Sequence, residues 1–331
     1  MSWAPAAPVS GFAAIEFAGE RLRLVVLPEF GGRVVSLSDR RTGREWLLGG
    51  ELTPSTLSGR GGVYDADVSW GWDECLPTVA PGPDPTRPQA SLRDHGDVWG
   101  RHLLLDTTSG VLTTTLHGSA GDGWPYTFTR SLAVEDAAVL ARYELENRGD
   151  RRLPFLWSMH PLLALEPGSR LHLPGVTGVA AGSVTGTPLE ELLGLDGPRR
   201  IRWPTPELAG GGHYRLDLIP GPEACDAVKL YAGPLERGLA AVSIPDGGWL
   251  GMTWDVAVAP YLGIWLSNGG WPRPDAGVRQ HALEPTTAPV DDVGQAIGSG
   301  MALWLRPGER RSWWVRLQVG AADDDLASFL R

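Results

Sequence analysis

Lysine is nearly absent from this chain of 331 residues. Lys229 is the only lysine among 29 basic residues, and arginine supplies the rest. The formal net charge is −10, and no cluster of basic residues could follow a phosphate backbone. Such an acidic field repels nucleic acid, so nucleic acid is not an expected partner.

Cysteine and long apolar runs are also scarce. Cys75 and Cys225 are the only cysteines, too few for a disulfide framework in a chain this long. No segment approaches the roughly 18–20 consecutive apolar residues of a membrane helix. The first residues have neither the basic nor the apolar region of a signal peptide. We therefore expect a cytoplasmic protein that does not bind a membrane.

Tryptophan, in contrast, is plentiful, with 15 residues. Its ring offers a flat apolar surface and one N–H donor, which suits packing against the C–H faces of sugars. Large β-sandwich cores also use tryptophan. A single tryptophan therefore indicates core packing at least as strongly as sugar binding.

The dominant pattern consists of short runs in which apolar residues alternate with polar ones, separated by Gly, Pro, Asn and Asp. This pattern is typical of strands joined by turns. We expect strands at residues 21–27, 33–39, 102–108, 111–117, 126–134, 138–147, 213–219, 227–232, 239–244 and 313–319. Glycine in the connections 39–45 and 107–111 indicates hairpins. The predicted fold class is all-β, and without a repeat or a linker we expect one domain over 1–331.

Helical signals are few. Residues 188–195 could form two turns, and the acidic run 323–325 favours the start of a short helix, because a helix N-terminus is partially positive. Residues 77–94 are rich in proline and polar residues and form the longest expected loop. A loop of this length in a compact domain is usually functional or mobile.

Four stretches place ionisable side chains among residues that restrict them. They contain Asp73 and Glu74 in GWDECL (71–76), His95 before a glycine, His160 in LPFLWSMHPLLAL (153–165), and Glu284 before a proline in HALEPTTAP (281–289). Each also has an ordinary structural interpretation as a core histidine, a turn residue or a carboxylate at the rim of a sheet. Composition and spacing alone leave both interpretations open.

The order and the flanks of these stretches resemble the aldose 1-epimerase (galactose mutarotase-like) family. Five motifs carry the resemblance in collinear order over residues 12–290: GGRVVSLSDRRTGREWL (31–47), His95-Gly96 with Arg101, WPYTFTRSLAV (124–134), ENRGDRRLPFLWSMHPLLAL (146–165) and LEPTTAP (283–289). The resemblance implies a large antiparallel β-sandwich, the supersandwich, with the site in a groove on a sheet.

The resemblance also implies an activity, the interconversion of the α and β anomers of a free sugar without cofactor or metal. Glu284 would be the base and His160 the acid, and partial burial would hold the pKa of Glu284 near the operating pH. His95 would orient the ring oxygen or a neighbouring hydroxyl. Asp73 and Glu74 are candidates for accepting hydrogen bonds from sugar hydroxyls, and Trp265 is a candidate sugar platform or a core residue. Cys75 is expected to take no part.

Departures from the family leave the sugar open. The segment 58–79 replaces a stretch typical of galactose mutarotases, and Leu-Leu-Ala follows the His-Pro pair of His160. Two alternatives therefore stay open. A hexose-6-phosphate mutarotase would need a basic pocket, for which Arg60, Arg93 and Arg101 are candidates. A carbohydrate-binding or sensing protein would keep the groove without turnover.

Other chemistries fit the sequence poorly. It has no HExxH, CxxC or GxSxG motif, and no P-loop or Rossmann glycine pattern opens a helix. His95 and His102 could contribute to a zinc site, but no third ligand is apparent from the sequence. The sequence does not predict an oligomeric state.

Overall fold

The computed structural model describes residues 2–51, 64, 68–119, 121, 123–185, 193, 200–272 and 277–331. Most of the regular structure in these residues is β-strand. The described helices are short, α2 (Val293–Gly298) and α3 (Leu326–Phe329). No helix in the described part of the chain is long and apolar enough to cross a membrane.

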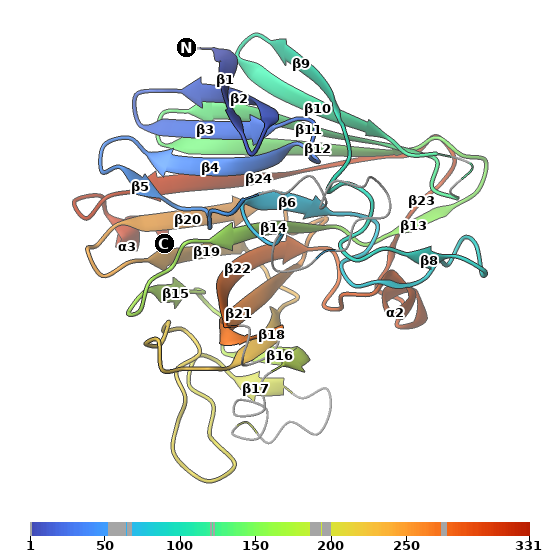
Figure 1. Ribbon diagram of the computed structural model, residues 1–331. Helices are drawn as coiled ribbons and strands as arrows, with labels where there is room; N and C mark the ends of the chain where they lie inside the picture. Colours follow the sequence, from blue (N-terminus) through green and yellow to red (C-terminus); the bar gives the residue numbers. More distant parts are fainter. Residues whose placement is uncertain are drawn as a thin grey trace.

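The first large sheet follows the order β1-β2-β3-β4-β6-β14-β22-β21-β18-β16-β17, with β5 paired to β4. Its strands are β1 (Trp3–Val9), β2 (Phe12–Ala18), β3 (Leu22–Leu27), β4 (Arg33–Asp39), β5 (Arg44–Glu45), β6 (Trp72–Cys75), β14 (Ser158–Leu163), β16 (Gly178–Thr185), β17 (Arg200–Arg202), β18 (Ala227–Ala232), β21 (Tyr261–Trp271) and β22 (Val278–Thr286). Figure 1 shows β6, β14, β22, β21 and β18 side by side in the middle of the molecule.

The second large sheet follows the order β15-β19-β20-β24-β12-β11-β10-β9. Its strands are β9 (Leu104–Thr108), β10 (Val111–His117), β11 (Tyr126–Glu135), β12 (Ala138–Asn147), β15 (Arg170–His172), β19 (Gly238–Ser243), β20 (Trp249–Trp254) and β24 (Arg310–Gly320). Two small pairs join β7 (Gly82–Pro83) to β8 (Ser91–Leu92) and β13 (Leu153–Phe155) to β23 (Leu303–Leu305).

The main hydrophobic core contains side chains from both large sheets, and strand alternation explains how each sheet supplies them. In β11, Tyr126, Phe128, Arg130 and Leu132 are buried while the residues between them are partly exposed, the period of two that a half-buried strand requires. The three apolar side chains among them share this core with Trp72 of β6 from the first sheet. The strands within each large sheet pair antiparallel, so the predicted all-β antiparallel sandwich is confirmed.

Two details of the sequence-based picture change. Residues 213–219 do not form a strand: the Leu216 amide donates to the carbonyl of Pro204, and only isolated bridges occur at His213 and Leu218. Leu216 and Ile219 are nevertheless buried, which accounts for the alternation of apolar and polar residues in this segment.

The expected loop 77–94 contains the β7–β8 pair and is therefore not structureless. The helix after residues 323–325 is confirmed, because Asp325 caps α3 by accepting from the Ser328 amide. The helix expected at 188–195 lies outside the described residues except for Leu193.

Candidate active site

Polar side chains from six neighbouring strands gather on one face of the first sheet, beside a cavity of about 270 Å³. In sheet order they are Arg33 (β4), Asp73 (β6), His160 (β14), Glu284 (β22), Trp265 (β21) and Lys229 (β18). Four side chains predicted for the site, Glu284, His160, His95 and Trp265, line this cavity. The sheet thus brings together residues that are far apart in the sequence.

The strand register positions His160 and Glu284. The β14–β22 pair aligns Ser158 with Thr286 and Leu162 with Ala282, which places His160 directly opposite Glu284. Pro161 and Pro285 follow these residues and have no backbone N–H to donate to the ladder. The strand pairing is therefore carried by the residues on either side, Ser158 with Thr286 and Leu162 with Ala282. Facing residues in an antiparallel pair have Cβ atoms about 4.5–5.5 Å apart. Both side chains therefore reach one small ligand.

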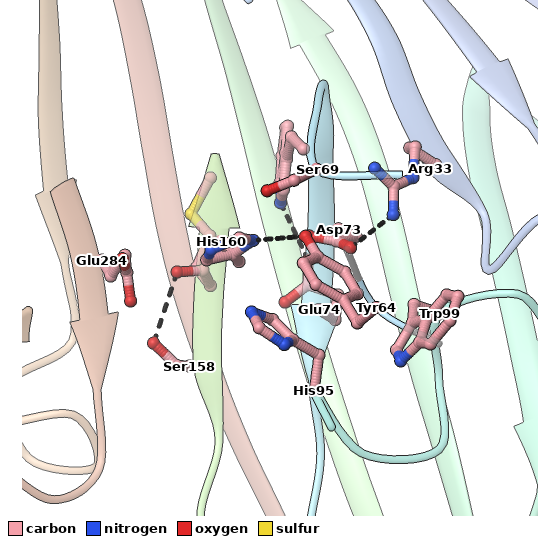
Figure 2. A network of polar contacts seen from close by, with 12 residues as sticks. Arg33, Tyr64, Ser69, Asp73, Glu74, His95, Trp99, Ser158, His160 and Glu284 are labelled. Atoms are coloured by element: carbon pink, nitrogen blue, oxygen red, sulfur yellow. Dashed lines mark hydrogen bonds and ion pairs between the residues drawn. The ribbon is translucent and has the colours of Figure 1, made fainter. Parts of the chain in front are cut away.

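A chain of buried charged groups orients His160 (Figure 2). Its Nδ1 lies 2.9 Å from Oδ1 of Asp73, and the other carboxylate oxygen accepts from Nη2 of Arg33 at 2.5 Å. Burial alone would raise the pKa of Asp73, but Arg33 and His160 lower it to about 2. An ionised Asp73 can only accept, so the proton of this bond belongs to Nδ1. Nε2 of His160 remains for chemistry.

Asp73 was predicted to bind sugar hydroxyls, but it does not line the cavity and is only 1% exposed. Its two oxygens already accept from His160 and Arg33. Its place in the structure is behind the histidine, where it fixes the ring and its tautomer.

His95 lies on a loop with a positive φ of 58°, a conformation that a residue with a Cβ adopts only under constraint from its surroundings. Its ring stacks on Tyr64, with centroids 3.5 Å apart, and lies 4.8 Å from the ring of His160. Its Nδ1 is 2.9 Å from the carboxylate of Asp94. Burial lowers the pKa of His95, and the hydrogen bond to Asp94 offsets part of that effect. His95 therefore favours the neutral imidazole.

Lys229 forms a buried ion pair with Glu284: its ammonium donates to Oε2. Burial raises the pKa of Glu284, yet Lys229 and His160 outweigh burial and the net pKa is lowered. This differs from the expected increase toward the operating pH, because sequence patterns did not reveal a cation across the sheet. Oε1 of Glu284 is buried and has no hydrogen-bond partner among the described residues, so the carboxylate offers one further acceptor there.

The contact between Lys229 and Glu284 depends on a glycine. Gly263 of β21 lies between two neighbouring strands, opposite Glu284 of β22 on one side and opposite Tyr231 of β18 on the other. A Cβ at this position would approach Oε2 of Glu284 to 3.2 Å and Cε of Lys229 to 3.4 Å. The absence of a side chain therefore leaves the space through which the two charged groups meet.

The remaining cavity wall is aromatic and acidic. Trp265 and Trp271, both partly exposed, meet edge to face with centroids 6.0 Å apart and line the cavity. Asp291 accepts from the hydroxyl of Tyr231 and lies 4.0 Å from the ammonium of Lys229. Such a wall combines an apolar ring surface with hydrogen-bond acceptors.

Glu74 was predicted beside Asp73 in the site, but it lies in the core between the sheets. Its side chain points to the opposite face of β6, as strand alternation requires for adjacent residues. It accepts from Arg130, Tyr143, Trp72 and Trp157. Each carboxylate oxygen already has a donor, and Glu74 does not line the cavity.

The basic residues considered for a phosphate do not line the cavity in the described part of the chain. Arg93 lies over the ring of Trp99, 3.9 Å from its centroid. Arg60 lies outside the described residues. His102, considered as a zinc ligand with His95, is exposed. Instead, potential ligand atoms of Cys75, His95 and His160 lie within 4.8 Å of one another.

The sequence analysis missed Tyr64, Arg33, Asp291 and the role of Lys229. Only Lys229 carried a usable signal, since it is the single lysine of an arginine-rich chain. Arg33 and Tyr64 lie in ordinary strand and loop contexts, and only the tertiary structure brings them to the site.

Comparison with known proteins defines the class of fold. No family model matches the sequence, and no curated protein matches it. Solved structures do match over nearly the whole chain, and they have the galactose mutarotase-like fold.

A galactose mutarotase-like protein from Lactobacillus casei ATCC 334 is 16% identical, with a TM-score of 0.64, and the match covers 93% of this chain and 100% of that one. One from Clostridium acetobutylicum is 13% identical, with a TM-score of 0.66 and coverage of 96% and 98%. A Klebsiella pneumoniae structure, named provisionally as an aldose 1-epimerase, is 14% identical, with a TM-score of 0.71 and coverage of 97% and 83%. The chain is thus a divergent example of this fold.

Proposed function

We infer that the protein is a cofactor-independent aldose 1-epimerase-like isomerase that interconverts the α and β anomers of a free sugar. The observation that carries this inference is the placement of His160 and Glu284 opposite each other on one cavity wall. Each has one group available: Oε1 of Glu284 lacks a partner in the part of the chain that the structure describes, and Nε2 of His160 is the nitrogen not held by Asp73. Acid–base exchange across one ring requires such a pair.

In the proposed reaction, Glu284 takes the proton of the anomeric hydroxyl while His160 delivers a proton from Nε2 to the ring oxygen. The C1–O5 bond breaks and an open-chain aldehyde forms. Rotation about C1–C2 presents the other face of the carbonyl, and the reverse proton transfers close the ring. No electrons leave the sugar, so neither an oxidant nor a reductant is needed.

The charges around the cavity favour a neutral sugar over a phosphorylated one. Three carboxylates, Asp94, Glu284 and Asp291, line the cavity, and the one lysine there is already paired with Glu284. A phosphate dianion would meet this negative wall without a free guanidinium from the described lining residues. Trp265 and Trp271 are proposed as the apolar surface for a sugar ring.

The replacement Glu284→Gln tests the acid–base role. Removing the base should slow anomer exchange by about 10²–10⁴-fold, the usual contribution of a positioned base or acid. Polarimetry or NMR exchange with a panel of free and phosphorylated aldoses measures the rate. Full activity in Glu284→Gln would disprove the proposed chemistry.

The same panel decides between catalysis and sensing. Sugar binding by calorimetry without accelerated anomer exchange in the unmodified protein would identify a carbohydrate-binding protein of this fold. Acceleration confined to phosphorylated sugars would contradict the charge argument.

A further inference from the structure

Beneath the proposed sugar site, three side chains of metal-ligand type converge. Cys75 lies on β6 with its side chain on the same face as Asp73, His160 lies on the neighbouring strand β14, and His95 enters from the loop. One potential ligand atom from each lies within 4.8 Å of the other two. Cys75 is fully buried, whereas His95 and His160 line the cavity, so these atoms meet beside the cavity and not on the surface.

The spacing is compatible with one metal ion. Any three atoms separated by at most 4.8 Å have a common point within about 2.8 Å of each. Zinc binds thiolate sulfur at about 2.3 Å and imidazole nitrogen at about 2.0–2.1 Å. Side-chain adjustments of less than about 1 Å would therefore close the site, well within the range of χ rotation.

The surroundings of both histidines match those of metal-bound imidazoles. Nδ1 of His160 is held by the carboxylate of Asp73, and Nδ1 of His95 by that of Asp94. A carboxylate on one ring nitrogen fixes the tautomer and makes the other nitrogen a better ligand. Two independent carboxylate–histidine pairs therefore lie next to one thiol.

The charges nearby also favour a cation. Glu284 and Asp94 line the cavity above the three side chains. Binding would displace the thiol proton of Cys75 and produce a thiolate, and both imidazoles would bind as neutral ligands. Three protein ligands leave a fourth position open toward the cavity, as in zinc sites that keep an exchangeable ligand.

We propose that Cys75, His95 and His160 form a site for one zinc-like divalent cation beside the cavity. Since Asp73 holds Nδ1 of His160, the ion binds Nε2, the nitrogen with which His160 would donate a proton, so the metal-bound protein cannot run the acid step. The cation is therefore an inhibitor of the mutarotase and not its cofactor. The inhibition rests on the proposed function, whereas the binding does not.

Cobalt(II) titration of the full chain, first stripped with a chelator, tests binding without any activity measurement. Coordination by a thiolate gives a thiolate-to-cobalt charge-transfer absorption, which should saturate at one cobalt per chain. Cys75→Ser and His95→Gln should weaken cobalt binding by at least about 10–100-fold, since even losses outside the ligand set cost that much. Cys225→Ser and His102→Gln, which change the same residue types elsewhere, should leave it unchanged.

The absence of a charge-transfer band at stoichiometric cobalt would overturn the proposal, as would a band that persists in Cys75→Ser or disappears in Cys225→Ser. Circular dichroism identifies any variant that fails to fold. If Cys75→Ser does not fold, His95→Gln still tests the ligand set.

Zinc titration of the mutarotation rate tests inhibition. We expect slowing by about 10²–10⁴-fold at saturating zinc, the usual contribution of one acid group. Chelator should reverse it, and it should occur in Cys225→Ser but not in Cys75→Ser. Cobalt binding in a protein without mutarotase activity would leave the site intact and reject the proposed function. Activity unaffected by bound zinc would reject the inhibition.

Discussion

Lys229 shows how one side chain sets the chemistry of another. It is the only lysine of the chain, it is buried, and its ammonium contacts Glu284. Burial raises the pKa of Glu284 and so favours its protonated form, which cannot accept a proton from a sugar hydroxyl. The lysine therefore keeps the proposed base ionised. An arginine is bulkier and more rigid and would not substitute for it freely in this space.

Replacing Lys229 should change the pH dependence of the reaction. In Lys229→Met the cation that lowers the pKa of Glu284 is lost while burial persists, so that pKa rises. Because only the ionised form is a base, the acid limb of the rate profile moves to higher pH. Rate measurements across a pH series check this shift. Lys229→Arg keeps the charge and should leave the limb closer to its original position; an unchanged limb in Lys229→Met would contradict this role.

At the scale of strands, the register between β14, β22, β21 and β18 decides which side chains meet. A shift of one residue would turn Glu284 away from the cavity, since successive side chains point to opposite faces. Gly263 is part of this arrangement, because it leaves open the space between Glu284 and Lys229. The strand register therefore positions Glu284 and Lys229, and the missing side chain of Gly263 leaves the space in which they meet.

Gly263→Ala tests that requirement. The added methyl group would lie 3.2 Å from Oε2 of Glu284 and 3.4 Å from Cε of Lys229, closer than most such contacts, and should displace these side chains by a few tenths of an ångström. We expect a loss of about tenfold in kcat, less than the about 10²-fold that a 1 Å misplacement can cost. Gly298→Ala, where nothing lies within 4 Å of the new Cβ, is the control. Equal activity of both variants would show that the space at Gly263 is not needed.

At the scale of the whole molecule, Glu74 and Arg130 join the two large sheets. Glu74 comes from β6 of the first sheet and Arg130 from β11 of the second, with their atoms 3.2 Å apart and both side chains buried. Burial raises the pKa of Glu74 to about 7, although Arg130 and its other donors act in the opposite direction. Glu74 follows Asp73 on β6 and points to the opposite face of the sheet, so the pair supports the strand that carries Asp73 from the core side.

Arg130→Met should destabilise the fold by about 3–5 kcal/mol, because it leaves a carboxylate buried without its cation. Urea unfolding measures the loss. A carboxyl whose pKa is raised in the folded state stabilises that state at low pH, and the benefit is lost as pH rises through the folded pKa. Without Arg130 the pKa of Glu74 rises further, because the cation that lowers it is gone. The loss of unfolding free energy in Arg130→Met should therefore be larger at about pH 8 than at about pH 5.5. Adding Glu74→Gln should remove this pH dependence; an unaltered dependence would argue against it.

The sequence by itself determined the all-β class and most strand positions, because alternation is a local feature, while the resemblance of its motifs to a known family selected His160 and Glu284 as a pair. It assigned Asp73 and Glu74 alike to the site, since neighbours in a strand look equivalent in a motif. Only the tertiary structure separated them, sending Asp73 to the histidine and Glu74 to the core. The same holds for Lys229, Tyr64 and Arg33, whose contacts cross the sheet. Strand pairing over long separations, which no local pattern encodes, decided what surrounds the proposed base and acid.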